Sequence, residues 1–236
     1  MELALDSSTD IMGLALLEQG VVRAELTWYS GQNHARQLFP ALDGLLARAG
    51  KSFSAIQAIF VARGPGSFNG LRVGIAAAKG LARALAAPVL GVSTLEAEAY
   101  PFRSWGLPIC PVHPAGRGEL AVALFQEQEG EWARLWEEEL LTPQDLLARL
   151  TGRTLFCGEP PPAFLELLGA TAVVPSPAAR LRRAGPLGEL GWSRLSQGQR
   201  DDPATLQPIY LRRPPITQPK PPAPSPTKEE THGSRL

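Results

Sequence analysis

The stretch that decides the fold is RGPGSFNGLRVGIAAAKGLARAL, residues 63–85. It opens with a glycine-rich loop, 63–70, that follows the apolar run Ile59-Phe60-Val61-Ala62. Glycines at 64, 66 and 70 permit backbone conformations and close approaches that a Cβ would obstruct. A buried strand that leads through such a loop into a long helix is typical of an α/β fold, and we expect the helix over 70–86.

The predicted helix carries a stripe of small residues along one face. Every fourth residue of this stripe is glycine or alanine: Gly70, Gly74, Ala78 and Ala82. Leu71, Ile75 and Leu85 flank it with the spacing of a buried helix face. A second stripe, which includes Arg72 and Lys79, is mostly cationic. Glycine within a helix costs roughly 1 kcal/mol relative to alanine, so we expect a partner element to press closely against the small-residue stripe.

Length and composition fit one domain or two small lobes with a sizeable core. The chain has 236 residues, 44% of them apolar, and its formal net charge is zero, so no global field favours nucleic acid or membranes. No apolar run approaches the roughly 20 residues that span a bilayer, and the first residues lack a signal-peptide pattern. Cys110 and Cys157 lie in separate strand-like runs, which indicates reduced, buried thiols in a cytoplasmic protein.

A polar turn, DSST, separates the first two of three predicted strands at 3–5, 11–17 and 21–28. Two interpretations of Asp6, Ser7, Ser8 and Thr9 stay open. Such a turn presents hydroxyls, a carboxylate and amides to a phosphate in ATPases of the sugar-kinase type. The same residues can instead form an Asx or Ser/Thr turn that satisfies its own backbone, and taken alone this second interpretation is favoured.

The order of the predicted elements indicates a mixed sheet followed by a second lobe. A helix over 33–49 begins at Asn33, and its His34 is interpreted as a polar surface or capping residue. Strands at 56–62 and 89–92 enclose the glycine-stripe helix in a βαβ unit. From about residue 100 a strand-hairpin-strand pattern restarts. We expect lobes at 1–99 and 100–213 and a proline-rich disordered tail at 214–236.

Two local helix signals complete the prediction. The helix at 33–49 should bury one face, composed of Ala35, Leu38, Leu42, Leu45 and Ala49. Ser176-Pro177 should begin another helix, because serine is a favoured N-cap and proline a favoured first helical residue. The last long helix is expected at 185–195.

Two runs of charge need an interpretation. Residues 127–139 hold six acids and one arginine and are best explained as a solvated hairpin. Residues 180–213 hold seven arginines and three acids, with little aromatic interleaving. An ordinary basic surface is therefore favoured for Arg180–Arg213, and a direct tRNA clamp stays open as the alternative.

Most enzymatic interpretations of the glycine loop fail on spacing. A P-loop requires GxxxxGK[ST], but Asn69 follows Gly64 by five positions and no lysine follows Gly70. Asn69 also stands where a dinucleotide-binding GxGxxG motif needs its third glycine. The nucleophile elbow GxSxG fails around Ser67. The three histidines, at 34, 113 and 232, form no metal-binding pair in sequence.

The same residues closely resemble the signature of the bacterial TsaB family, also called YeaZ. The resemblance rests on 63–85, on GVSTLEA at 91–97 and on LALDSST at 3–9, where the family has LALDTST. HARQLFP at 34–40 resembles the family's histidine-led helix, and PIYLR at 208–212 its C-terminal end. The chain departs from the family at Asn69, where threonine is usual, and at Pro114 and Ala121.

The resemblance implies a two-lobed fold of the actin/sugar-kinase/Hsp70 class, built on RNase H-like mixed sheets. It also implies a non-catalytic role in forming N6-threonylcarbamoyladenosine at position 37 of tRNAs that read ANN codons. The family's catalytic paralogue, TsaD, carries an HxxxH metal pair just after the corresponding helix, whereas residues 95–100 here contain no histidine. The resemblance further implies an assembly with TsaD and the ATPase TsaE, supplied with threonylcarbamoyl-AMP by TsaC-type enzymes.

We therefore expect a scaffold whose helices 33–49 and 70–86 bind TsaD, or a second copy of this chain when TsaD is absent. The expected contacts come from both helices: His34, Leu38, Leu42, Leu71, Arg72, Gly74, Ile75, Ala78, Lys79 and Ala82. No catalytic residue, metal or cofactor is expected for the isolated chain, while ATP or ADP and Mg²⁺ are expected at the level of the complex. In the alternative, the chain is an ATP-dependent enzyme whose Asp6–Thr9 turn holds phosphates and whose Asp6 holds Mg²⁺.

Overall fold

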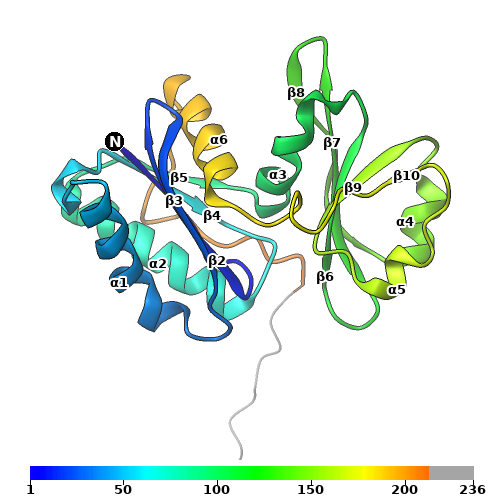
Figure 1. Ribbon diagram of the computed structural model, residues 1–236, viewed down its shortest axis with the longest axis horizontal. Helices are drawn as coiled ribbons and strands as arrows, with labels where there is room; N and C mark the ends of the chain where they lie inside the picture. Colours follow the sequence, from blue (N-terminus) through cyan, green and yellow to red (C-terminus); the bar gives the residue numbers. More distant parts are fainter. Residues whose placement is uncertain (213–236) are drawn as a thin grey trace, which may run out of the picture.

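The computed structural model describes residues 1–212 and shows two lobes, each built on a five-stranded sheet (Figure 1). The first sheet has the order β3-β2-β1-β4-β5 and the second the order β10-β9-β6-β7-β8. The first sheet consists of β1 (Glu2–Asp6), β2 (Ile11–Glu18), β3 (Val21–Tyr29), β4 (Ala58–Ala62) and β5 (Val89–Val92). The second consists of β6 (Ile109–Pro114), β7 (Leu120–Gln128), β8 (Glu131–Leu141), β9 (Thr154–Gly158) and β10 (Ala172–Val173).

The second lobe repeats the topology of the first, as the sequence predicts. β1 pairs antiparallel with β2 and parallel with β4, and β6 pairs in the same two ways with β7 and β9. Read from its other edge, the second sheet therefore has the strand order of the first. Both sheets are mixed because a hairpin supplies two antiparallel strands and a crossover supplies the parallel ones.

In the described residues, five helices lie between strands in the chain, and a sixth follows the last strand. They are α1 (His34–Arg48), α2 (Phe68–Leu85), α3 (Thr94–Ala99), α4 (Pro143–Arg149), α5 (Pro162–Leu165) and α6 (Ala184–Ser196), with short 3-10 turns at Phe53–Ala55 and Tyr100–Trp105. Ser93 and Thr142 cap α3 and α4 through their hydroxyls, as serine and threonine do at helix N-termini. None of the helices in the described residues has the length and apolar character needed to cross a membrane.

The central strands of the first sheet are covered on both faces. Leu3 and Leu5 of β1 belong to the core cluster that includes α1 and α2, whereas Ala4 between them belongs to the cluster that includes α6. Successive side chains of a strand point to opposite faces, so β1 is buried throughout. α1 and α2 therefore cover one face of the sheet, and α6 covers the other (Figure 1).

Each lobe receives a helix from the other half of the chain. α3, which follows the first sheet in sequence, packs Leu95 and Ala99 into the second lobe's core. α6 follows the second sheet but packs Ala184 and Leu187 against the first. The predicted boundary at residue 99 therefore differs from the division into cores, because the two crossing helices bury their apolar faces across it.

Two further predictions differ from the structure, and a third cannot be compared with it. α1 buries His34, Leu38, Leu42, Leu45 and Leu46, so the predicted buried face was wrong at Ala35, which is exposed. The prediction of a helix at Ser176-Pro177 was also wrong: the segment forms a turn closed by hydrogen bonds from Ala179 and Arg180 to Ser176. The predicted tail at 214–236 lies outside the described residues.

Candidate functional site between the lobes

The polar groups of the DSST turn are satisfied by other groups of the same chain. Ser8 donates hydrogen bonds from its backbone N and its Oγ to Asp6 Oδ1, at 2.8 and 2.5 Å. Ser7 Oγ donates to Gly70 O at 2.9 Å. Thr9 Oγ1 accepts a hydrogen bond from the Ile11 backbone. The contacts from Ser8 to Asp6 are those of an Asx-type turn, and the residues Asp6, Ser7 and Ser8 are buried.

The glycine loop packs directly on this turn. Ser67 N donates to Ser8 O at 2.6 Å. A Cβ on Gly66 would lie 2.3 Å from Ser8 O, and a Cβ on Gly70 would lie 2.1 Å from Ser7 O, closer than van der Waals contact allows. A Cβ on Gly74 would meet Ser7 Oγ at 2.3 Å. An element does press closely against the small-residue stripe, as expected: at Gly70 and Gly74 it is the chain's own DSST turn.

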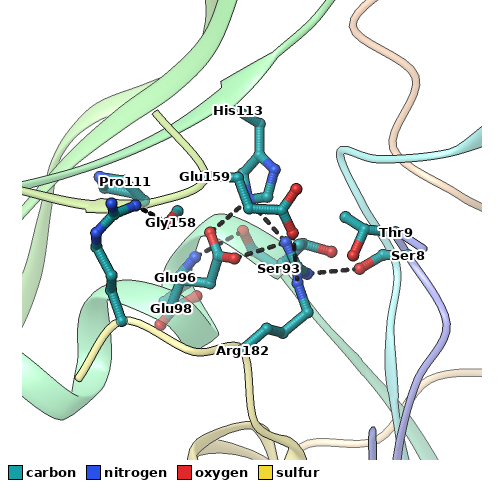
Figure 2. Close-up of polar contacts among 12 residues, drawn as sticks. Ser8, Thr9, Ser93, Glu96, Glu98, Pro111, His113, Gly158, Glu159 and Arg182 are labelled. Carbon is teal, nitrogen blue, oxygen red and sulfur yellow. Dashed lines mark hydrogen bonds and ion pairs between the residues drawn. The ribbon is translucent and has the colours of Figure 1, made fainter. Parts of the chain in front are cut away.

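Arg182 enters the space between the lobes from the segment that precedes α6 (Figure 2). Its side chain is 2% exposed, and Nη1 lies 3.1 Å from Asp6 Oδ2 and 2.7 Å from Ser8 Oγ. Nη2 lies 2.5 Å from Glu98 Oε1, and Nε lies 3.7 Å from Glu159 Oε1. One guanidinium thus joins the first lobe's turn to carboxylates of α3 and of the second lobe.

His113, at the end of β6, completes this cluster. Its Nε2 lies 2.5 Å from Glu98 Oε2 and 2.7 Å from Arg182 Nη2. Burial alone lowers the pKa of Arg182, but the charges of Glu98, Asp6 and Glu159 outweigh it and raise that pKa above its ordinary value. Arg182 is therefore a permanent cation in the floor of the interlobe space.

A cavity of about 910 Å³ opens above this cluster. It lies between the two lobes and is lined by residues that include Thr9, Gly66, Phe68, His113, Leu140 and Glu159. Arg72 and Arg212 also line it; the first lies over the Phe68 ring, and the second pairs with Glu119. The cavity thus touches Thr9, whereas the side chains of Asp6 and Ser8 are bound to Arg182 behind it.

A second polar cluster joins α3, β8 and α6. Arg194 Nη2 lies 2.5 Å from Glu96 Oε1, and Arg134 Nη2 lies 3.4 Å from Glu96 Oε2. Ser93 Oγ donates to Glu138, which also pairs with Arg134. Burial raises the pKa of Glu138; Ser93 and Arg134 oppose this effect, and the negative charge of Glu96 adds to it. This cluster fixes α3 between the lobes.

The predicted partner-binding residues fall into two groups. Eight have buried side chains or a buried backbone and are used in the first lobe's own packing: His34, Leu38, Leu42, Leu71, Gly74, Ile75, Ala78 and Ala82. His34, for example, places Nε2 2.7 Å from Thr9 O, so its surface assignment was wrong. Arg72 is exposed and Lys79 partly so; Lys79 Nζ donates to Leu206 O at 3.0 Å. Of this set, Arg72 and Lys79 are the residues that keep exposed or partly exposed side chains, and their partner contacts stay a prediction.

A different face of α2 is open. Asn69, Arg72, Ala76, Gly80, Arg83 and Ala84 are exposed. Apart from its chain neighbours and the adjacent backbone of α2, no atom of the described residues lies within 4 Å of a Cβ built on Gly80. Ala76, Gly80 and Ala84 recur every four residues, so this outer face has its own stripe of small residues. α1 lies beside α2 and exposes Phe39 on its surface (Figure 1).

The arginines of residues 180–212 mostly bind groups of their own chain. Arg180 donates to the carbonyls of Pro175 and Gly158. Arg183 pairs with Glu25, and Arg194 and Arg212 with Glu96 and Glu119. Arg213 lies outside the described residues. These contacts favour the ordinary interpretation of the basic run over a tRNA clamp, which stays a prediction.

Sequence reasoning missed the interlobe cluster. In the sequence, Arg182 is one charge in the arginine run and His113 is an isolated histidine. The single local signal is a polar residue within an apolar strand, since His113 follows Ile109-Cys110-Pro111-Val112 in a strand that is buried there. Glu98 and Glu159 carry no such signal, because their partner lies far along the chain.

Comparison with known proteins gives the family. The family model described as TsaD, tRNA N6-adenosine threonylcarbamoyltransferase, matches residues 28–156. The Bacillus subtilis protein named tRNA threonylcarbamoyladenosine biosynthesis protein TsaB is 31% identical over 217 residues, covering 89% of this chain and 93% of the relative. The chain belongs to the TsaB family.

Other TsaB relatives agree with this assignment. Escherichia coli TsaB is 29% identical over 217 residues, which cover 89% of this chain and 94% of that protein. The solved structure of YeaZ from Pseudomonas aeruginosa has a TM-score of 0.75 and 29% identity, with 89% of this chain and all of that chain covered. The predicted fold of the actin/sugar-kinase/Hsp70 class, with two lobes and mixed sheets, is confirmed.

Proposed function

We propose that this TsaB-family chain is a non-catalytic scaffold subunit needed for threonylcarbamoyl transfer to adenosine 37 of tRNA. Its relatives carry the name of tRNA threonylcarbamoyladenosine biosynthesis proteins, and the matching family model describes the transferase. In the proposal, the chain acts in the cytoplasm and pairs with a catalytic TsaD-type subunit. TsaE and tRNA join through the complex, and ATP or ADP with Mg²⁺ bind at that level. A homodimer forms when TsaD is absent.

The contact between Arg182 and Asp6 carries the non-catalytic part of this proposal. A carboxylate at the end of β1 can bind Mg²⁺ only if its oxygens are free to do so. Here Asp6 Oδ2 faces Arg182 at 3.1 Å, and Oδ1 accepts both hydrogen bonds from Ser8. The guanidinium supplies the positive charge that a phosphate-bound metal would otherwise bring.

The outer face of α2 supports the proposed pairing with TsaD. An exposed glycine in a helix costs about 1 kcal/mol relative to alanine, and the described residues make no packing use of Gly80. Small residues four apart let a second helix approach closely. Ala76, Gly80 and Ala84, together with the cation of Arg72, form the surface that we assign to TsaD.

Co-purification tests the docking surface. Gly80→Leu should abolish recovery of TsaD from the same organism with the tagged chain, because the leucine side chain fills the space that a closely packed TsaD helix would occupy. Ser193→Leu is the matched control, since Ser193 is exposed on α6, which covers the opposite face of the sheet. If Gly80→Leu retains TsaD as well as Ser193→Leu does, the surface is wrongly assigned. Gly74→Leu is unsuitable here, because it would collide with Ser7.

The ATP-dependent enzyme is kept as the second candidate because of the interlobe cavity. The cavity reaches Thr9 and Ser67, which lie at the turn and at the N-terminus of α2. Backbone amides at a helix N-terminus favour an anion. In this candidate, Arg182 would have to leave Asp6 before Mg²⁺ could bind there.

A further inference from the structure

The interlobe cluster contains more negative than positive groups. Asp6, Glu98 and Glu159 present carboxylates to the single guanidinium of Arg182. Glu98 and Asp6 are 5% and 2% exposed at their side chains, so water screens them little. Buried carboxylates call for further cations or protons, and His113 is the remaining titratable group that contacts Glu98 and Arg182 in the described residues.

Three of these groups converge as metal ligands do. One ligand atom from each of Glu98, His113 and Glu159 lies within 4.8 Å of the other two. Carboxylate oxygens and an imidazole nitrogen are common ligands of Zn²⁺ and Mn²⁺. His113 and Glu159 also line the 910 Å³ cavity, which would leave room for water as a further ligand. A set of three protein ligands beside open space is typical of an accessible metal centre.

The guanidinium of Arg182 does not satisfy the hydrogen-bonding capacity of these ligands. Glu98 Oε1, Glu159 Oε1 and Arg182 Nε are buried atoms without a hydrogen-bond partner among residues 1–212. Glu98 Oε1 lies 2.5 Å from Nη2, yet the direction is unsuitable for a hydrogen bond. An N–H group bonds along one direction, whereas a metal ion attracts oxygen from any side. Glu98 Oε1 and Glu159 Oε1, which accept no hydrogen bond within the described part of the chain, are therefore better suited to a metal ion than to a guanidinium.

His113 adds a second mismatch. Its Nε2 faces both a carboxylate oxygen, at 2.5 Å, and a guanidinium nitrogen, at 2.7 Å. A ring nitrogen either donates one proton or accepts one, so Nε2 cannot donate to Glu98 and accept from Arg182 at once. If a metal ion were bound, His113 and Glu98 could both hold it through lone pairs, and neither would need a proton from the other.

We propose that Glu98, His113 and Glu159 form a site for a divalent transition-metal ion such as Zn²⁺, and that Arg182 is the built-in cation that occupies it in the metal-free chain. When the metal binds, Arg182 keeps Nη1 on Asp6 and Ser8 and withdraws Nη2 and Nε from the three ligands. The metal and Arg182 compete for the same carboxylates, so removal of the guanidinium strengthens metal binding.

Calorimetric titration of the full chain with Zn²⁺ tests the site. All proteins carry His232→Asn, which removes a histidine of the C-terminal segment. Arg182→Met should bind one Zn²⁺ at least tenfold more tightly than the parent, and Arg182→Met/His113→Asn should lose this gain. Titration with Co²⁺ provides a second readout, because visible absorption reports the ligand geometry and a thiolate band would reveal misplaced binding at Cys110 or Cys157.

Two results would overturn the proposal: a folded Arg182→Met variant that binds Zn²⁺ no more tightly than its parent, or a gain that survives His113→Asn. Arg182→Lys is used if Arg182→Met does not fold. Lysine keeps the charge but is shorter and lacks the planar fork, so it should still yield a gain that depends on His113. A folded Arg182→Lys variant without that gain equally refutes the site.

Discussion

Arg182 Nη1 lies 3.1 Å from Asp6 Oδ2, although 176 positions separate the two residues. This contact joins the last residue of β1 to the segment that leads into α6. It engages the carboxylate of the DSST turn, for which the sequence favours an Asx or Ser/Thr turn and leaves a phosphate site open. The same guanidinium reaches Glu98 and Glu159, so a single side chain couples the two lobes.

Arg182→Met should lower the free energy of unfolding by about 3–5 kcal/mol, because it leaves buried carboxylates without their cation. Urea denaturation measures this loss. Arg183→Met is the matched control: its side chain is 58% exposed and pairs with Glu25, so its loss should stay below about 1 kcal/mol. Equal losses for the two variants would show that the interlobe ion pairs contribute little.

Two glycines of α2 should respond to alanine in opposite directions. Gly80→Ala should stabilise the chain by about 0.5–1 kcal/mol, because the site is open and alanine restricts the unfolded chain. Gly74→Ala should destabilise it, because the new Cβ would lie 2.3 Å from Ser7 Oγ and disturb the turn. The midpoints of chemical denaturation compare them. Stabilisation by both would contradict the packing of α2 on the turn.

Glu138 should make stability depend on pH. Burial raises its pKa in the folded chain, so the ionised form costs stability at neutral pH, and protonation relieves this cost as the pH falls through the raised pKa. Glu138→Gln should therefore be more stable than the parent at neutral pH, with the difference shrinking as the pH falls toward the ordinary glutamate range. Glu137→Gln, at a side chain 87% exposed, should show no such trend. Thermal unfolding across pH measures both.

ATP with Mg²⁺ should not bind the isolated chain at sub-millimolar concentration, because Arg182 holds the Asp6 carboxylate. Isothermal titration decides this point. Sub-millimolar binding that Asp6→Asn abolishes would instead favour the ATP-dependent enzyme. If the titration gives only the heat of dilution, and Asp6→Asn gives the same heat, the result agrees with the scaffold.

Much of the fold follows from local pattern. Buried strands and turn residues alternate clearly in this sequence. This alternation predicts the antiparallel strands β1, β2 and β3, the strand before the glycine loop and the repeat after residue 100. Ser93 and Thr142 predict the starts of α3 and α4, because their hydroxyls cap the helix N-termini. These features depend on neighbours within a few residues, which sequence shows directly.

The site could not be predicted in the same way. Arg182 contacts Asp6 and Glu98 because α6 packs on the first lobe and α3 packs on the second. No local sequence pattern shows that these two helices pack across the lobes. Periodicity located a small-residue stripe at Gly70 and Gly74 but did not reveal what it faced. The structure shows the turn at Ser7 on one side and an open face around Gly80 on the other.

Reconstituted tRNA modification tests the central claim most directly. Unmodified tRNA that reads an ANN codon is incubated with TsaD, TsaE, ATP and a source of threonylcarbamoyl-AMP, with or without this chain, and the modified nucleoside is quantified by mass spectrometry. We predict product only when TsaD and this chain are both present, and none when this chain replaces TsaD. Equal product without this chain, or product from this chain in the absence of TsaD, would contradict the account.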